Sequence, residues 1–205
     1  MRIIFPILIL IGVIDYSDFI NLNKTATFEI PDIEYSESDL RISVSEKGLY
    51  HLDDKLFSGY IISKHENGEL AIKKCYYNGL LEGEWLTYFE NGEIASKRPY
   101  HKGKKHGIHE GYYENGQQKF SYHFEHGLSQ GTHLVWYENG QLAKELNYKD
   151  GYELGSQKVW RTDGKMRSNY VVRENGRRYG MIGLKRCKKL DSESGEIEPY
   201  KGKGQ

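Results

Sequence analysis

Residues 76–92 read Tyr-Tyr-Asn-Gly-Leu-Leu-Glu-Gly-Glu-Trp-Leu-Thr-Tyr-Phe-Glu-Asn-Gly, and related stretches recur along the chain. Three series of glycines return with one shared step of 24 residues. They are Gly68, Gly92, Gly116, Gly140 and Gly164; Gly59, Gly83, Gly107, Gly131 and Gly155; and Gly79, Gly103, Gly127 and Gly151. A period between about 20 and 50 residues is the signature of a repeat protein. The series therefore predict an array of similar units, and a drifted last unit holds Gly176 and Gly180, each one residue late.

The glycines also predict where the chain turns. Asn-Gly and Asp-Gly suit the centre of a type I′ turn, in which both central residues have positive φ. We therefore expect a hairpin tip at each glycine of the first series, which serve as structural turns. Paired glycines four residues apart, such as Gly79 and Gly83, predict the other and longer connection.

The segments between these turns have the pattern of β-strands. After each Asn-Gly, apolar and polar residues alternate, as in Leu70, Ile72 and Tyr76, which predicts strands with one buried face. Aromatic residues precede each turn in two rows, which we expect to hold neighbouring hairpins together. These rows are Tyr88, Tyr112, Trp136 and Trp160, and Phe89, Tyr113 and Tyr137. The predicted fold is all-β, an elongated antiparallel meander of about five to six hairpin repeats with almost no helix.

The quoted stretch closely resembles a MORN repeat, specifically the bacterial MORN-variant repeat. That family repeats Tyr-x-x-Gly-x-x-x-Gly-x-Trp-x-x-Tyr-x-x-x-Gly, and the resemblance covers roughly residues 49–187. His109, His133 and Gln157 stand where the best copy has Trp85. The resemblance implies an open sheet of β-hairpins that acts as a scaffold or a membrane-proximal binding module. It also implies no enzymatic activity and no cofactor, and bacterial members are often classed with the antitoxin partners of secreted toxins.

Candidate binding residues follow from the aromatic rows and from the charge distribution. The whole chain has 29 basic and 29 acidic residues, which argues against a histone-like or polyanionic protein. Residues 141–190 nevertheless hold 13 basic and 5 acidic residues, a net charge of +8, whereas residues 1–50 carry a net charge of −4. The predicted binding residues are Trp85, Tyr88, Tyr112, Trp136, Tyr137, Trp160, Arg161, Arg177, Arg178 and Arg186.

Several partners remain open at this point. A basic sheet with aromatic residues suits nucleic acid, anionic lipid or an acidic protein, and a merely solvated end cap is the alternative. We expect a protein partner, with a toxin as one candidate, and keep anionic lipid as the second hypothesis. Export would disfavour nucleic acid, and no small-molecule substrate is evident.

The N-terminus predicts export. One arginine precedes twelve apolar residues, 3–14, as in a secretory signal peptide, although the cleavage site that follows is weak. The alternative is a buried N-terminal strand in a cytoplasmic protein. The expected division is 1–18 signal peptide or apolar anchor, 19–48 acidic leader with short strands, 49–187 repeat array and 188–205 charged tail. The expected location is the periplasm or cell envelope.

The cysteines and histidines predict neither a disulfide nor a metal site. Cys75 and Cys187 are about nine strand steps apart, on the order of 40 Å, so free thiols or a bond between chains are expected. Six histidines lie between His101 and His133, and the pairs at 106/109 and 123/126 resemble metal-ligand spacing. Strand alternation splits each pair across two faces, which predicts histidines that face solvent and no metal. An enzyme using this histidine-rich middle is the third hypothesis, because no catalytic motif accompanies it.

Overall fold

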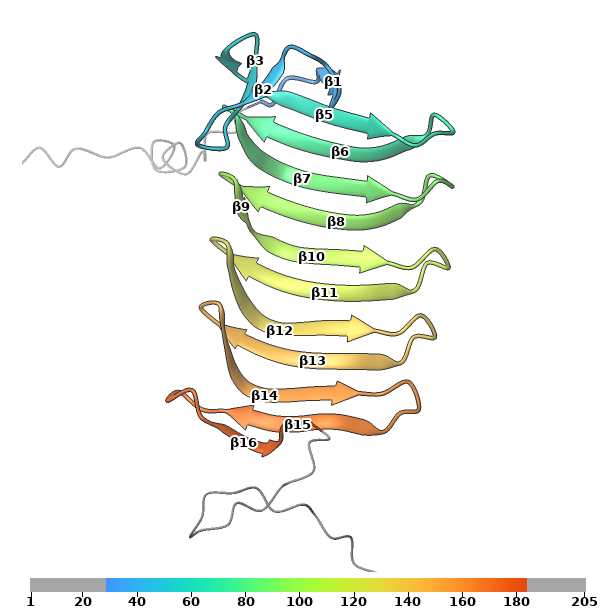
Figure 1. Ribbon diagram of the computed structural model, residues 1–205, viewed down its shortest axis with the longest axis vertical. Coiled ribbons are helices and arrows are strands. Elements are labelled where there is room, and N and C mark those ends of the chain that lie inside the picture. The colour runs from blue at the N-terminus through green and yellow to red at the C-terminus, as the bar shows by residue number, and fades with distance from the viewer. Residues whose placement is uncertain (1–28, 184–205) are drawn as a thin grey trace, which may run out of the picture. The chain divides into compact units, whose positions relative to one another are not determined.

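The computed structural model describes residues 29–183, which form strands, turns and loops without a helix (Figure 1). Consequently, this part of the chain holds no helix that is long and apolar enough to cross a membrane. The chain divides into two units, Met1–Ile30 and Pro31–Gln205, and all described strands belong to the second. The apolar run 3–14 and the charged tail 188–205 lie outside the described residues, so the predictions about them stand untested.

Thirteen strands form one open sheet whose order follows the chain. Five hairpins make up most of it, and a single strand ends it. They are β5 (Gly59–Lys64) with β6 (Leu70–Tyr77), β7 (Leu80–Tyr88) with β8 (Ile94–His101), β10 (Gly107–Tyr112) with β11 (Gln118–Glu125), β12 (Leu128–Trp136) with β13 (Leu142–Lys149), β14 (Tyr152–Trp160) with β15 (Met166–Val172), and β16 (Arg178–Met181). A two-residue strand, β9 (Lys104–Lys105), pairs with β8. The predicted all-β hairpin array is therefore confirmed.

The N-terminal edge departs from the simple meander. Strand β1 (Glu34–Ser36) pairs with β5 in parallel, with Tyr35 opposite Ile61, so the sheet is mixed. A second sheet of three short strands follows: β2 (Ile42–Val44), β3 (Tyr50–Leu52) and β4 (Lys55–Leu56).

This small sheet covers the first hairpin. Phe57, Ile61 and Tyr76 are buried together, and the rings of Tyr50 and Tyr76 lie 4.3 Å apart. Ile42 and Leu52 pack against the same cluster. The first hairpin thus has an apolar core on one face, made from residues before and within the array.

The Glu-Asn-Gly turns differ from the predicted type I′ geometry. Each glycine has positive φ, for example 84° at Gly92, but the asparagine before it does not. Gly92 N donates to Phe89 O, and Phe89 N donates to Glu93 O, which closes a longer loop around a type I turn. The asparagine is favoured for another reason: Asn91 Oδ1 accepts a hydrogen bond from Glu93 N at 2.9 Å.

The type I′ turns lie at the opposite ends of the strands, at the glycines assigned to the longer connection. Asn78 and Gly79, with φ of 47° and 77°, form a two-residue turn between β6 and β7. Lys102-Gly103 and Asp150-Gly151 repeat this geometry. The predicted positions of the two kinds of turn are therefore reversed, because Asn-Gly pairs occur in both places.

The remaining glycine series bends the strands. Gly83, four residues after Gly79, has a φ of 71° inside β7, and Lys74 pairs with Trp85 while Tyr76 pairs with Leu81. Strand β7 therefore holds two more residues than β6 at this point, which is a bulge. Figure 1 shows β7, β12 and β14 curving at their N-terminal ends, where this series lies.

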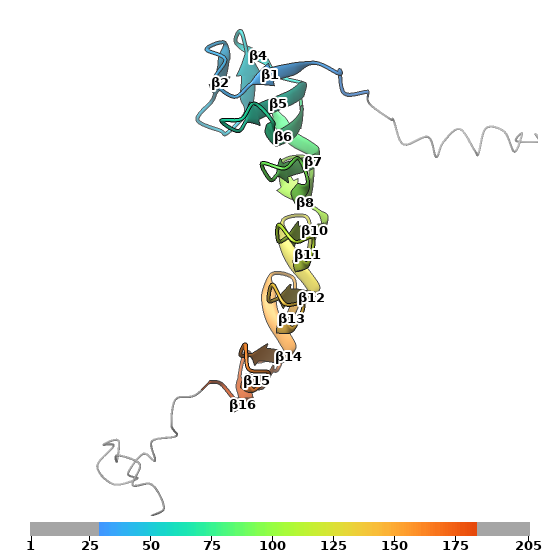
Figure 2. The same cartoon turned by 90° about the vertical axis from the view of Figure 1, so that its right-hand side faces the viewer.

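The strands β7 to β16 form a single layer (Figure 2). Only seven apolar side chains are buried in the described residues, three of them in the cluster around Ile61. The predicted single buried face is therefore only partly right: most side chains on both faces are half-exposed. Neighbouring hairpins are held together by strand pairing and by stacking of side chains along the sheet, without a second layer over β7 to β16.

Candidate binding surface

One face of the sheet carries a stack of side chains from equivalent positions. It contains Trp85, His109, His133 and Gln157 from one strand of each hairpin and Tyr100, Phe124 and Tyr148 from the other, and we call it the stacked face. Ring centroids along it lie 6.0 Å apart for Trp85–Tyr100, 5.5 Å for Tyr100–His109 and 4.7 Å for His109–Phe124. The stack continues through His133 to Tyr148 at 4.6 Å. The Tyr100–His109 contact and the Phe124–His133 contact, at 5.3 Å, join one hairpin to the next, whereas the other contacts lie within a hairpin.

The two stacked histidines are buried, in contrast to the solvent-facing histidines that the sequence predicts. His109 and His133 are 3% and 6% exposed, and Gln157 at the equivalent position is fully buried. Each side chain reaches a backbone carbonyl ten residues earlier in the chain. His109 Nε2 donates to Pro99 O, and Gln157 Nε2 donates to Asn147 O, both at 2.8 Å.

Burial sets the charge of these histidines. It lowers the pKa of His109 to about 4 and also lowers that of His133, because desolvation penalises the imidazolium form. The nearby cations Lys105 and Arg98 lower the pKa of His109 further. Both rings are neutral near pH 7 and serve as core residues.

The opposite face, which we call the charged face, is built from ion pairs between strands. Lys73 pairs with Glu34 at 2.6 Å, Lys97 with Glu84 at 2.9 Å, and Lys158 with Glu145 at 2.9 Å. Exposed pairs of this kind contribute little to stability, on the order of 0–1 kcal/mol each.

The predicted aromatic row lies along the turn side of this face. Tyr88, Tyr112, Trp136 and Trp160 each end a strand beside a turn, and all four are half-exposed. Tyr112 OH donates to Glu110 Oε2 at 3.2 Å. Cross-strand partners widen the row: Ile94 opposes Tyr88, Leu142 opposes Trp136 and Met166 opposes Trp160. The four aromatic residues and their four cross-strand partners, which include Gln118 opposite Tyr112, form a surface that we call the aromatic stripe.

The second aromatic row connects hairpins. Tyr137 OH donates to Trp160 O at 2.8 Å, and Tyr113 OH donates to Trp136 O at 2.9 Å. Tyr137, a predicted binding residue, thus holds the next hairpin in place. Trp85, another predicted binding residue, lies within the stacked face. Its buried Nε1 has no hydrogen-bond partner among residues 29–183.

The basic residues divide into two groups. Arg161 lines a hollow of about 760 Å³ together with Lys144 and Arg167, with Val159, Ser168, Ile182 and Gly183 as the other walls. Only Asp163, at 3.6 Å from Arg161, pairs with one of these cations in the described part. Lys144 and Arg167, which lie near Arg161, were not among the predicted binding residues.

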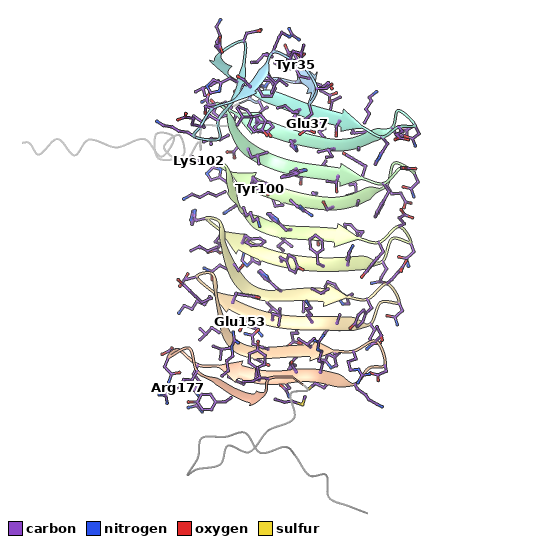
Figure 3. The ribbon with its side chains drawn as sticks, in the orientation of Figure 1. Tyr35, Glu37, Tyr100, Lys102, Glu153 and Arg177 are labelled. Carbon is purple, nitrogen blue, oxygen red and sulfur yellow. The ribbon has the colours of Figure 1, made fainter. Side chains whose placement is uncertain are left out.

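Arg177 and Arg178 lie apart from the hollow. Arg178 pairs with Glu153 at 3.0 Å and lies over the ring of Tyr170, so its charge is largely compensated. Arg177 lies in an exposed turn near the same end of the sheet as Glu153 (Figure 3). Arg186 lies outside the described residues.

The described residues offer no metal centre. Between residues 29 and 183, no three His, Cys, Asp or Glu side chains come close enough to share an ion. His101, His106 and His126 form a row with ring centroids 5.9 and 6.0 Å apart.

Cys75 is buried, and burial raises the pKa of its thiol. Cys187 lies outside the described residues, so the disulfide prediction remains untested.

Comparison with known proteins identifies the repeats. The profile of the MORN repeat variant matches three consecutive segments, 81–102, 105–126 and 129–150. Each segment spans one hairpin with its bend and its Glu-Asn-Gly turn, and ends at the first residue of the following type I′ turn. No curated protein matches the chain. Such repeats form binding or scaffold modules and are in general not enzymatic.

Proposed function

Because residues 81–150 consist of repeats of the MORN-variant family, we propose that this chain is a non-enzymatic scaffold that binds another protein through its aromatic stripe. The supporting observation is the stripe itself, a row of half-exposed aromatic side chains along an open, single-layer sheet. Aromatic side chains dominate the energetics of many protein interfaces. Successive hairpins place them about 10 Å apart, two strand spacings, which suits an extended surface better than a pocket.

A pull-down with a matched control tests this proposal. The full chain, a Tyr112→Ser/Trp136→Ser variant and a Tyr152→Ser variant are used as bait under identical conditions. Tyr152 is an aromatic residue outside the stripe and is 79% exposed. We expect a protein that the wild type and the Tyr152 variant retain and that the stripe variant loses. Equal retention by all three baits would reject the stripe as the binding surface.

Export and a toxin partner belong to the same proposal. The apolar run 3–14 supports delivery to the periplasm or envelope of a bacterium. A secreted toxin is one class of partner, as in antitoxin-like members of the family. Sequencing of the mature N-terminus tests the export: an intact Met1 on a cytoplasmic protein would contradict it. Protection of cells from the captured partner tests the antitoxin role.

The cationic hollow supports a second candidate, binding to anionic lipid. Lys144, Arg161 and Arg167 lie together with the exposed side chain of Ile182, a combination that suits a charged headgroup beside an apolar chain. Flotation with phosphatidylserine vesicles tests it, with phosphatidylcholine vesicles as the control. Changing the three cations to Ser should abolish flotation, whereas Arg178→Ser should not, because Arg178 is paired with Glu153. Flotation that survives the triple change would contradict lipid binding at this hollow.

A further inference from the structure

The two ends of the large sheet carry opposite charge. Residues 31–58, which include β1 to β4, hold seven acidic and three basic residues, a net charge of −4. Residues 158–183, which include β15 and β16, hold seven basic and two acidic residues, a net charge of +5. Figure 3 shows Glu37 at one end of the sheet and Arg177 at the other. The zero net charge of the chain therefore hides a strong separation along the sheet.

Much of this charge is not compensated within one chain. At the acidic end, Glu34, Glu37 and Asp39 have cationic partners, but Asp32, Glu46, Asp53 and Asp54 are exposed and have no ion pair in the described residues. At the basic end, Lys158 and Arg178 pair with Glu145 and Glu153. Lys165, Arg167, Arg173 and Arg177 are exposed and have no such partner within residues 29–183.

Both ends of the sheet also have open backbone edges. The outer edge of β16 has no partner strand among the described residues. At the other end, β1 is the outermost strand of the sheet among the described residues. It pairs only with Tyr60, Ile61 and Ile62 of β5. A hollow of about 550 Å³, lined by Ser36, Glu37, Ser38, Ile62, Ser63 and Lys64, lies where β1 ends and β5 continues. Unpaired edges attract further strands.

We propose that the basic C-terminal end of this sheet binds the acidic N-terminal end of a second copy of the chain, so that copies associate head to tail. Contacts between like ends are disfavoured, because they would bring Arg167 and Arg177, or Asp32 and Asp53, against their own counterparts. A head-to-tail contact joins two different surfaces, and each bound copy keeps one free end of each sign. Such contacts do not close on themselves unless a ring forms, and short chains of copies result. This inference does not depend on the protein-binding role of the aromatic stripe.

Two charge-reversal variants of the full chain test the proposal. The first carries Asp32→Lys, Glu46→Lys and Asp53→Lys, and the second carries Lys165→Glu, Arg167→Glu and Arg177→Glu. All six positions are exposed. Asp53 has a positive φ in a turn, and Lys102 has nearly the same φ in an equivalent turn, so lysine suits this position. Sedimentation velocity measures the size of each protein at low salt and at about 1 M salt, where the Debye length falls to about 3 Å.

We expect the wild type to form larger species at low salt and to dissociate at high salt. Each variant alone has two ends of the same sign, so each should sediment as a monomer at low salt. An equimolar mixture of the two variants should associate again, because each end then finds an end of opposite sign. This recovery separates a surface effect from a folding defect in either variant.

Three results would overturn the proposal. They are a wild type that is monomeric at low salt, a variant that associates alone as strongly as the wild type, and a mixture that fails to recover. Association of the wild type that persists unchanged at high salt also contradicts it, since that association would be apolar.

Discussion

At the scale of single residues, the stacked face uses different side chains for one task. His109, His133 and Gln157 all fill the inside of a bend and donate to a backbone carbonyl ten residues earlier. A neutral imidazole and an amide both supply a planar donor of similar size. The sequence marks these positions only as departures from the tryptophan of the best repeat. The shared hydrogen bond explains why such different residues are interchangeable there.

The stacked histidines should make stability depend on pH. The unfolded chain titrates His109 near pH 6.5, but the folded chain does so only near 4. Between these values the unfolded state binds more protons, so stability is complete above about pH 6.5 and falls as the pH drops toward 4. The loss from His109 is on the order of 3 kcal/mol. Urea unfolding at several pH values measures it.

The matched variant is His109→Gln/His133→Gln, which copies Gln157. It should fold at neutral pH and lose this part of the acid destabilisation. Other groups titrate in the same range, so the difference between the two proteins is the relevant quantity. Parallel pH curves for wild type and variant would show that the two rings are not held neutral.

At the scale of strands and turns, side chains at the turn edge decide how one hairpin meets the next. The Glu-Asn-Gly asparagines bond to the backbone two residues on, and Asp163 does the same in the fifth hairpin. Tyr113 and Tyr137 then bond to the following hairpin. The residues that close each turn are therefore close in sequence to the tyrosines that bond to the next hairpin.

Replacing Asn139 separates its side-chain bond from its backbone conformation. Asn139 Oδ1 accepts from Gln141 N at 3.0 Å. Asn139→Ala should cost about 1 kcal/mol, because that hydrogen bond is lost. Asn139→Asp should cost much less, since Asp163 shows that a carboxylate oxygen serves equally well. Thermal unfolding compares the two; equal losses would indicate that the backbone conformation is decisive.

Removing the Tyr137 hydroxyl tests its role between hairpins. Tyr137→Phe should destabilise the sheet by about 0.5–1.5 kcal/mol, because Trp160 O loses its donor while the ring remains. Partner binding in the pull-down should be unchanged. If the variant has normal stability but no longer binds the partner, Tyr137 belongs to the binding surface and does not connect hairpins. Phe89→Tyr adds a hydroxyl at the equivalent position of the second hairpin and provides the reverse experiment.

At the scale of the whole sheet, contacts are confined to neighbouring hairpins. Every strand pair with substantial contact consists of neighbours in the sheet, with no second layer over β7 to β16. Stability in such an array is approximately a sum of local terms and interfaces between neighbours. The first hairpin has an added core of Phe57, Ile61 and Tyr76, whereas β16 is a short, exposed edge.

Hydrogen exchange should therefore reveal a gradient along the sheet. Amides of β5 and β6 should exchange slowest and those of β16 fastest, with the middle hairpins between them. Native-state exchange followed by mass spectrometry measures this order. Uniform protection from β5 to β16 would indicate one cooperative unit and contradict the local model of stability. Salt-dependent protection of β16 would in addition report the head-to-tail contact.

The candidate surface could be predicted only in part. Tyr88, Tyr112, Trp136 and Trp160 were found because each stands at a fixed distance from a turn, and the structure places all four along one side of the sheet. Tyr137 belongs to a neighbouring row, and only the direction of its hydroxyl reveals a connecting role. The hollow around Lys144 and Arg161 was not predicted, because its walls come from three strands, β13, β14 and β15, and from two segments that follow strands.

The sequence by itself determined the number, order and length of the hairpins. A turn depends on the backbone angles of a few consecutive residues. Glycines spaced by 24 residues therefore mark the turns in the sequence itself. Only the tertiary structure decided which glycines form the type I′ turns, where the strands bend, and that His109 and His133 are buried. Those outcomes depend on the register between strands and on stacking between residues 9 or 15 positions apart. Such interactions exist only once neighbouring hairpins have come together.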